Sequence, residues 1–409
     1  MKGFFTLQET QSKTRPDGKL HTCVSCGLVK GCQSPKIPPY GNFKKEILIV
    51  GEAPGRVEDE KGKPWQGKSG RFLKRTLKEM GVDLFEDCLS INAVCCRPVT
   101  KSGEDRAPTG KEIDSCRRNL IKHLNEYQPK IVLLLGDIAL DSFLRHRWKK
   151  NLGTISKWRG WAIPDQEYKT WVYPTFHPSF VIREDKKEVD LVWKKDLQQA
   201  IDYVDEPFRK WKKPNIEFIE DLSIFSEMKS GLVSIDYETT GLKPHAPGHR
   251  IVCASVSPTP DLAYVFMMSR SKKERQPFID LLKNERVRKM AHNMRYEENW
   301  SVVRLKQSVI GWDWDSMLAT HILDNRPDIC SLKFQTYVRF GLIDYDSEIS
   351  PYLRSKDGKD GNSLNEIMKL VEMPGGKEKL MEYCGMDTVT QYRLAELQMN
   401  EMNYSFLPF

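Results

Sequence analysis

The sequence predicts an α/β protein made of two domains. In the first half of the chain, short apolar runs such as EILIVG and IVLLLG alternate with helical patterns. In the second half, three apolar runs come first and helical patterns follow. Alternation of buried strands and helices indicates a parallel sheet covered on both faces. Strands followed by helices indicate a mixed sheet with helices packed on it.

A change in composition marks the expected boundary between the two domains. The stretch DEPFRKWKKPNIEF, rich in charge and with two prolines, interrupts the pattern of strands and helices. We therefore expect a first domain over residues 1–206, a linker over residues 207–217 and a second domain over residues 218–409. A chain of 409 residues is long enough for two separate cores.

The first domain should contain three buried strands, because three apolar runs end in glycine, proline or polar residues. These stretches, with the turn residues that bound them, cover residues 46–55, 131–137 and 171–179. Helical patterns between them cover residues 69–81 and 110–127. In parallel sheets the functional loops follow the carboxyl ends of the strands, so the loops after Val50 and Thr175 are candidate sites.

The second domain should also begin with three strands. They cover residues 231–242, 249–258 and 262–268. The helical segments that follow cover residues 273–284, 297–306, 314–323 and 379–400. We find no internal repeat and no low-complexity tract.

Charge and cysteine content narrow the possible classes of protein. The net charge of +8 is a weak indication of a polyanionic partner. No apolar run is long enough to span a membrane, and the N-terminal residues lack the apolar core of a secretory signal. We therefore expect a cytoplasmic protein without membrane partners. In that compartment the ten cysteines more often act as thiols or metal ligands than as disulfides.

Several cysteines have the spacing of a metal site. Cys23 and Cys26 form a CxxC pair, Cys95 and Cys96 lie in SINAVCCRP, and Cys116 ends EIDSC. A CxxC pair with two distant cysteines fits either zinc or a four-cysteine iron–sulfur cluster. A redox dithiol, or buried thiols without a metal, are further alternatives. Spacing alone does not decide among them.

The order of motifs over roughly residues 20–200 resembles the iron–sulfur uracil-DNA glycosylases known as family 4. The motifs are CxxC, GEAPG, GKSGRFL, CRP, APTGKEIDSC, LLLG and HPS. The resemblance implies a parallel-sheet α/β/α glycosylase domain and a [4Fe–4S] cluster. The implied cluster ligands are Cys23, Cys26, Cys96 and Cys116. The cysteines left over as bystanders are Cys32, Cys88 and Cys95. The cluster would have a structural role, as a cross-link between the N-terminal segment and two distant loops.

The same resemblance implies a uracil site. Trp65 would stack on the flipped base, Asn92 would bond the O4 and N3 edge, and His177 would face O2 as negative charge develops there. Glu52, with Glu58, would position the attacking water or stabilise the sugar cation. The family usually has Phe at the position of Trp65, so a domain that senses uracil without excising it is an alternative.

The second half has a series of acidic motifs. SIDYETTGL places Asp236 and Glu238 on one face of a strand, where a divalent ion could bind, although an isolated DxE is common. Together with AHNMRYEENW, WDSMLATHIL and YCGMDTVTQYRL, it is similar to the proofreading 3′–5′ exonuclease domain of phage-type family A DNA polymerases. The resemblance covers roughly residues 214–400. It implies an RNase H-like mixed-sheet domain with two Mg²⁺ or Mn²⁺ ions. The implied ligands are Asp236, Glu238, Glu297 and Asp387.

Three more residues belong to this expected site. Tyr383, one helical turn before Asp387, would orient the nucleophilic water. Asn293 would shape the site or contact the terminal nucleotide. The family normally has Asp where this chain has Glu297, so Asp315 is either a structural acid or a substitute ligand.

Taken together, the two resemblances are to the N-terminal portion of phage-type DNA polymerases. They imply a protein of DNA repair and replication that acts on single-stranded 3′ ends and on uracil-containing DNA, in a bacterial or phage-infected cell. We recognise no palm or fingers motif, so a polymerase domain would act in cis or in trans. The alternatives are an exonuclease with a non-catalytic DNA-binding first domain, or a scaffold with two decayed sites.

Overall fold

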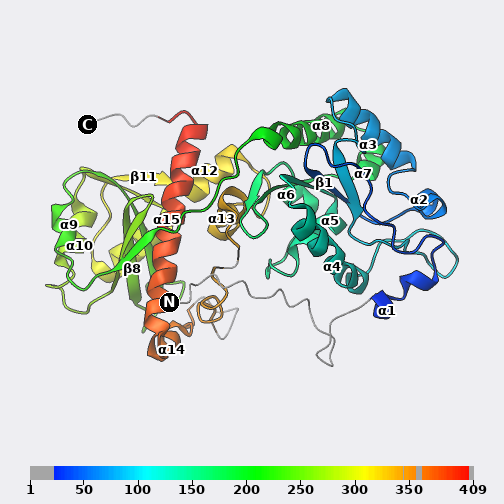
Figure 1. The fold of residues 1–409 in the computed structure, drawn as a ribbon. Helices are drawn as coiled ribbons and strands as arrows, with labels where there is room; N and C mark the ends of the chain where they lie inside the picture. The colour runs from blue at the N-terminus through cyan, green and yellow to red at the C-terminus, as the bar shows by residue number, and fades with distance from the viewer. Residues whose placement is uncertain (1–22, 344, 356–361, 405–409) are drawn as a thin grey trace. The chain divides into compact units, whose positions relative to one another are not determined.

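The computed structural model describes residues 23–343, 345–355 and 362–404. The chain forms two compact units (Figure 1). The first comprises Met1–Trp211 and Tyr337–Ile343, and the second comprises Lys212–Thr336 and Asp344–Phe409. The division falls inside the segment expected as a linker, while the expected domain bounds themselves stay predictions. Both units are α/β, which confirms the predicted fold class.

The first unit contains a five-stranded sheet with the order β2-β1-β3-β5-β4. Its strands are β1 (Ile47–Gly51), β2 (Cys88–Asn92), β3 (Ile131–Leu135), β4 (Ile163–Asp165) and β5 (Thr170–Thr175). All pairings are parallel except that of β4 with β5. Every residue of β1 and β3 is buried, which explains their uninterrupted apolar sequences. The sequence patterns did not predict β2 or the antiparallel edge strand β4.

Helices cover both faces of this sheet, as predicted (Figure 1). On one face, Leu73 of α3 and Trp193 of α8 pack against Ile49 and Leu133. Figure 1 shows α4 and α5 on the opposite side of β1. The helices of this unit are α1 (Cys23–Cys26), η1 (Leu28–Lys30), α2 (Arg56–Lys61), α3 (Lys68–Glu79), α4 (Gly110–Tyr127), α5 (Asp137–Leu144), α6 (Ile155–Trp158), α7 (Pro178–Glu184), α8 (Lys187–Asp202) and η2 (Tyr203–Asp205).

The second unit contains a six-stranded mixed sheet with the order β11-β10-β7-β8-β9-β6. Its strands are β6 (Asn215–Phe218), β7 (Gly231–Thr239), β8 (Ile251–Thr259), β9 (Leu262–Met267), β10 (Val287–Ala291) and β11 (Trp312–Asp315). Strand β8 is antiparallel to both neighbours, whereas the other pairings are parallel. This arrangement of β7 to β11 is the RNase H-like fold that the sequence predicts, with β6 added at one edge.

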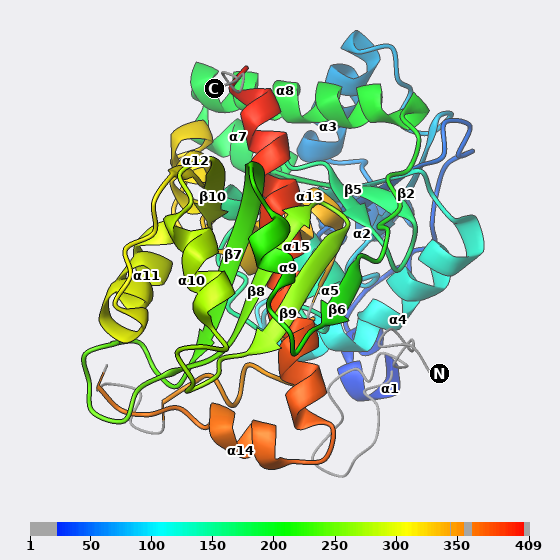
Figure 2. The same ribbon diagram turned by 90° about the vertical axis from the view of Figure 1, so that its left-hand side faces the viewer.

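Helices pack on both faces of this sheet (Figure 2). Ile235 and Tyr237 pack with Phe278 of α10 on one face. The long helix α15 crosses the other face, where Leu380 and Cys384 join a second core. The helices of this unit are α9 (Ile224–Glu227), α10 (Gln276–Lys283), α11 (Met294–Trp300), the π-helix η3 (Ser301–Leu305), α12 (Ser316–Leu323), α14 (Ile367–Glu372) and α15 (Gly376–Glu401). Helix α13 (Leu332–Phe340) begins in this unit, and its residues from Tyr337 onward belong to the first unit.

No helix within the described ranges has the length and apolar character to cross a bilayer.

Candidate active sites

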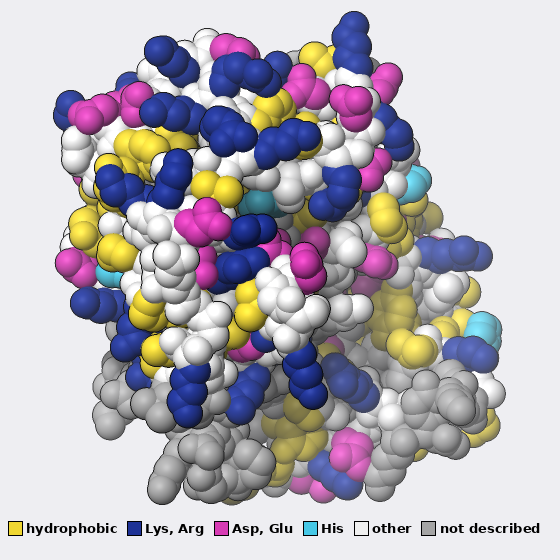
Figure 3. Space-filling view, turned by 90° about the vertical axis from the view of Figure 1, so that its right-hand side faces the viewer, with side chains coloured by type: hydrophobic (Ala, Val, Ile, Leu, Met, Phe, Trp, Pro, Cys, Tyr) yellow, Lys and Arg dark blue, Asp and Glu magenta, His cyan; other side chains and the backbone are white. Residues whose placement is uncertain are grey.

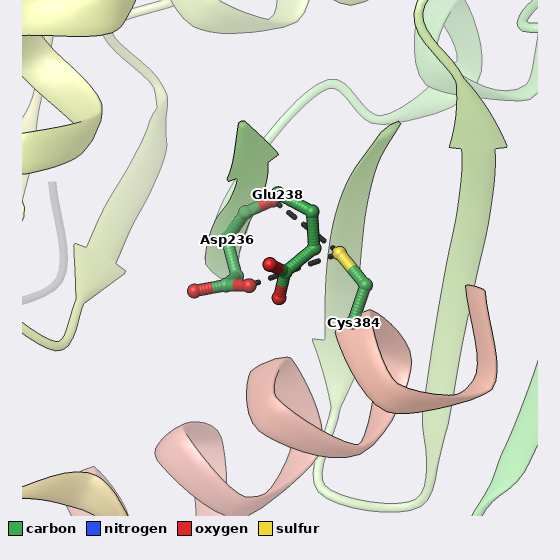
Figure 4. A group of neighbouring side chains, drawn as sticks. All are labelled: Asp236, Glu238 and Cys384. Atoms are coloured by element: carbon green, nitrogen blue, oxygen red, sulfur yellow. Dashed lines mark hydrogen bonds between the residues drawn. The ribbon is translucent and has the colours of Figure 1, made fainter. Parts of the chain in front are cut away.

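The DxE pair of β7 meets helix α15 in a buried cluster (Figure 4). Asp236 and Glu238 point to the same side of the strand, because they are two residues apart. The thiol of Cys384 lies 3.7 Å from Oδ2 of Asp236. The ligand atoms of these three residues all lie within 4.8 Å of one another. Cys384 was not predicted as a site residue, although it lies in the YCGMD motif.

Asp387 of α15 forms two further hydrogen bonds at this site. Its Oδ1 accepts a hydrogen bond of 2.6 Å from the hydroxyl of Tyr345 and another from the ammonium of Lys333. Lys333 also lies over two rings, with Nζ 4.0 Å from the centroid of Tyr345 and 4.2 Å from that of Tyr383. Tyr383, one helical turn before Asp387, is therefore next to the acids, as expected. Lys333 and Tyr345 were not predicted.

The two adjacent glutamates of α11 have different surroundings. Glu297 is 3% exposed, and its Oε2 has no hydrogen-bond partner among the described residues. Burial raises its pKa, and the charge of Asp236 raises it further. Glu298 instead accepts hydrogen bonds from Val309 N at 3.0 Å and from Trp312 Nε1 at 2.9 Å. Glu297 faces the acid cluster, while Glu298 fixes the loop after η3.

The carboxylate of Asp315 forms hydrogen bonds with backbone amides. It accepts hydrogen bonds from the amides of Asn293 and Met294, both at 3.0 Å. It also accepts from the amides of Met317 at 2.9 Å and Leu318 at 3.3 Å, which caps α12. This geometry fits the structural alternative for Asp315. Asn293 precedes α11 with a left-handed backbone (φ 74°) and so begins the helix that carries Glu297.

The burial of these acids favours a bound cation. Burial raises the pKa of Asp236 to about 7, and the charge of Asp387 adds to this rise. Burial likewise raises the pKa of Glu238 well above its usual value. Like charges in a buried cluster disfavour ionisation unless a cation neutralises them. Carboxylate oxygens are the ligands that Mg²⁺ and Mn²⁺ prefer, so the donor set fits such an ion.

In the first unit, three of the expected uracil-site residues lie at the carboxyl ends of strands of the same sheet. Glu52 follows β1, Asn92 ends β2 next to Gly51 in register, and His177 follows β5. A Cβ atom at Gly51 would lie 2.5 Å from Oδ1 of Asn92 and 2.8 Å from the ring of Trp65. Glycine is thus required where these two side chains approach the backbone.

The loop before α3 fixes the position of Trp65. The backbone of Trp65 is left-handed (φ 57°). The ring of Trp65 stacks on the ring of His177, with 5.7 Å between the ring centroids and 26° between the ring planes. Oε1 of Glu58 accepts hydrogen bonds from the amides of Gln66 and Gly67, at 2.8 and 2.7 Å. Glu58 therefore holds the loop that carries Trp65.

His177 and Glu52 are both buried enough to change their ionisation. Burial lowers the pKa of His177 to about 4, and the charge of Arg183 contributes. The amide of Ser179 donates to Nδ1 of His177 at 3.2 Å, so the neutral ring carries its proton on Nε2. Burial raises the pKa of Glu52, and Asp137 raises it further.

The structure brings most of the expected cluster ligands together. Cys26, Cys96 and Cys116 share one buried cluster, which also contains Cys32 and Cys95. Cys23 begins the short helix α1, which packs against α4, the helix of Cys116.

Helix α4 is held by a capping box between Thr109 and Glu112. A hydrogen bond from Cys95 lowers the pKa of Cys116 to about 7, which favours its thiolate. Cys88 lies elsewhere, in the core of the sheet. The expected ligand set therefore fits an iron–sulfur cluster in its sulfur chemistry, and Cys32 and Cys95 belong to the same cluster of side chains.

Comparison with known proteins decides the family of the first unit. A model of the uracil DNA glycosylase superfamily matches residues 38–200. The type-4 uracil-DNA glycosylase of Saccharolobus solfataricus is 34% identical over 165 residues, which are 39% of this chain and 73% of that protein. The chain belongs to the type-4 uracil-DNA glycosylase family. The family resemblance predicted from the motifs is thereby confirmed, while the roles of single residues stay predictions.

This type-4 family member also resembles a longer protein. The DNA polymerase of Bacillus phage SP01 is 24% identical over 324 residues, which are 70% of this chain. The chain covers 33% of that polymerase. Among solved structures, Brucella melitensis NrnC with bound Mg²⁺ aligns with 47% of this chain and 84% of its own, at 19% identity and a TM-score of 0.31.

Proposed function

We propose that this protein processes DNA with two active sites, a uracil-DNA glycosylase in the first unit and a two-metal 3′–5′ exonuclease in the second. It would be the N-terminal part of a phage-type DNA polymerase, with the polymerase domain in cis or in trans, in the cytoplasm of a bacterial or phage-infected cell. The observation that carries the exonuclease is the cluster of four acids on β7, α11 and α15, in which Glu238, Glu297 and Asp387 are buried and Asp236 is half-buried.

In the exonuclease, the four acids would hold two divalent ions, which activate water and stabilise the leaving oxygen of the phosphodiester. The hydroxyl of Tyr383 would orient the water, since it is on the same face of α15 as Asp387. Lys333, bonded to Asp387, would bring positive charge to the phosphate.

In the glycosylase, the amide of Asn92 would read the Watson–Crick edge of uracil, since it can both donate and accept. The Nε2–H group of the neutral His177 would donate a hydrogen bond to O2 and stabilise the negative charge that develops there as uracil leaves, while the proton stays on the ring. Glu52, after β1, would position the attacking water or stabilise the sugar cation. Glu58 would act through Trp65, whose loop it holds.

The cysteine cluster would hold a [4Fe–4S] cluster that serves as a cross-link. Its ligands come from α1, from the loop after β2 and from α4, which are far apart in the sequence. Anaerobically purified protein should be brown and contain about four irons per chain. Cys116→Ser should remove the colour and lower the melting temperature of the first unit, whereas Cys88→Ser should leave the iron content unchanged. Stoichiometric zinc without iron would contradict the proposal.

A basic surface supports contact with DNA phosphates. Figure 3 shows Lys and Arg side chains gathered in the upper part of one face. In the first unit, the exposed basic residues of α2, α3 and the loop between them are Arg56, Lys61, Lys63, Lys68, Arg71, Lys74, Arg75 and Lys78. This surface adjoins the loop of Trp65, where a flipped base would enter.

One observation favours the second candidate function, a uracil sensor without excision. Trp65 is 8% exposed, and its large ring packs flat against His177. A ring of this size narrows the space between Asn92 and His177, so uracil could bind without reaching the geometry for cleavage.

Two assays test the proposed activities. The exonuclease should shorten a labelled single strand from its 3′ end only with Mg²⁺ or Mn²⁺, and Asp236→Ala with Glu238→Ala should abolish this. In that double variant, uracil-containing single-stranded DNA should form alkali-labile abasic sites, and Asn92→Ala should remove them. No abasic sites, but tighter binding of uracil DNA than thymine DNA, would favour the sensor.

A further inference from the structure

The second unit has a cationic cavity outside the acid cluster. Its volume is about 310 Å³, which lies at the small end of ligand-binding pockets. It is formed by the start of β8, the end of β9, the loop before α10, η3 and α14. Its lining residues are His249, Arg250, Ile251, Val252, Met267, Met268, Ser269, Arg270, Arg275, Arg304, Leu305 and Met368.

Four arginines line this cavity without a carboxylate among its lining residues. Nη2 of Arg304 donates to the carbonyl of Ala246 at 2.7 Å, and Nη2 of Arg250 faces Sδ of Met368 at 3.1 Å. Within the described ranges, Nε of Arg275 and Nε of Arg304 are buried without a hydrogen-bond partner. Buried donors normally have partners, so these two indicate an anionic ligand.

The cavity lies at the same edge of the sheet as the acids. Glu238 pairs in register with Cys253 of β8, and Thr239 pairs with Ile251, which lines the cavity. The amide of Arg250 donates to Oγ1 of Thr240 at 2.8 Å, just beyond the end of β7. Strands β8 and β9 are the next two neighbours of β7, about 5 and 10 Å from it across the sheet.

The chemistry of the lining fits a nucleotide. Guanidinium groups bind phosphate oxygens in pairs, and arginine is common where phosphate is recognised. Met267, Met268 and Met368 supply a polarisable apolar floor on which a base can rest. A cationic rim with an apolar floor would hold one nucleotide by its phosphate and its base.

We propose that this cavity binds a nucleotide of the DNA strand upstream of the 3′ end that lies at the acid cluster, through its backbone phosphate. The inference rests on the proposed exonuclease, because that activity places a DNA end at the acids. The site would hold the strand between successive cleavages, so that longer strands bind more tightly than dinucleotides.

Binding of labelled dT8 to the full chain in EDTA, which prevents hydrolysis, tests this inference. Arg270→Gln with Arg275→Gln should weaken binding about tenfold and reduce the salt slope by about 1.4, the value for two lost single-strand phosphate contacts. Arg286→Gln, an exposed arginine outside the cavity, is the matched control and should change little. Melting temperatures of both variants would exclude unfolding as the cause.

Two outcomes would overturn the inference. Equal weakening by Arg286→Gln would mean that charge alone matters. Loss of dTMP binding in the double variant without loss of dT8 binding would mean that the cavity takes free nucleotides instead of the strand. Cleavage with Mg²⁺ is a separate arm. If the wild-type protein does not shorten dT8, the proposed exonuclease is wrong, but the binding data in EDTA still decide the cavity.

Discussion

The ammonium group of Lys333 is bonded to Oδ1 of Asp387, an acid that the exonuclease motifs assign to a metal ion. The two residues are 54 positions apart and lie on α13 and α15. The same carboxylate oxygen accepts from Tyr345, and Lys333 lies over the ring of Tyr383. Lys333 neutralises part of the charge of the acid cluster, and it would compete with the proposed divalent ion for Asp387.

Replacing Lys333 should strengthen metal binding. Two unit charges about 4 Å apart interact by about 4 kcal/mol at an effective dielectric constant of 20, so removing the lysine should favour a cation. We expect Lys333→Met to bind Mn²⁺ at least about tenfold more tightly without DNA, as measured by electron paramagnetic resonance. Lys333→Arg keeps the charge and should retain the wild-type affinity. Weaker Mn²⁺ binding by Lys333→Met would mean that the lysine organises the ligands.

Substitutions of the two adjacent glutamates of α11 should have different effects, one on exonuclease activity and the other on stability. Glu297→Gln should reduce Mg²⁺-dependent shortening of DNA by about a hundredfold or more and leave the melting temperature unchanged or higher, since it removes a buried charge. Glu298→Gln should lower the melting temperature by a few degrees, because it weakens charge-assisted bonds to Val309 and Trp312. It should keep its activity within about threefold.

The reverse pattern, with Glu298 essential and Glu297 dispensable, would show that the site is assigned to the wrong glutamate. Loss of activity in Asp315→Asn without loss of stability would make Asp315 the third ligand.

The half-buried His177 should make the stability of the first unit sensitive to acid. Its pKa is lowered to about 4, below the value of about 6.5 for an unfolded chain. Between these pH values the unfolded protein binds more protons, so stability falls as the pH drops through this range. The loss should reach roughly 3 kcal/mol at pH 4.

The measurement for His177 is the difference in unfolding free energy between wild type and His177→Gln from pH 7 to pH 4. Other buried histidines, such as His146, contribute equally to both proteins and cancel. The difference should narrow on acidification. A constant difference would mean that His177 is not buried as a neutral ring.

Sequence patterns predicted the parts of the fold that depend on continuous burial. Strands β1 and β3 are buried along their whole length, so their apolar runs are unmistakable. Strand β2 was missed because polar Ser90 lies inside it, although that residue is fully buried. Strand β4 was missed because it has three residues, including a proline, and lies at the sheet edge.

The residues of the candidate sites likewise fall into two groups, those that local sequence motifs could indicate and those that only the folded chain brings together. Asp236, Glu238, Tyr383 and Asp387 lie in local motifs whose spacing reflects one strand face or one helix face, so the sequence could indicate them. Lys333 reaches Asp387 through tertiary packing from another helix, which no local spacing encodes. The arginine cavity draws on residues from position 249 to position 368, so its charge becomes visible only in the folded chain.

The size of the Trp65 ring should limit the rate at which the first unit excises uracil. The ring occupies space next to Gly51 and stacks on His177, and its Nε1 has no hydrogen-bond partner among the described residues. Trp65→Phe would keep a stacking ring, widen the pocket and remove an unsatisfied donor, which offsets part of the packing loss. We expect excision of uracil from single-stranded DNA to rise about tenfold in the exonuclease-dead background, with a stability cost of about 1 kcal/mol. Trp171→Phe, a buried tryptophan at the start of β5, is the matched control and should cost stability without changing the rate. If the rate does not rise in Trp65→Phe while uracil DNA still binds preferentially, the size of the ring is not what prevents excision, and the first unit acts as a sensor for another reason.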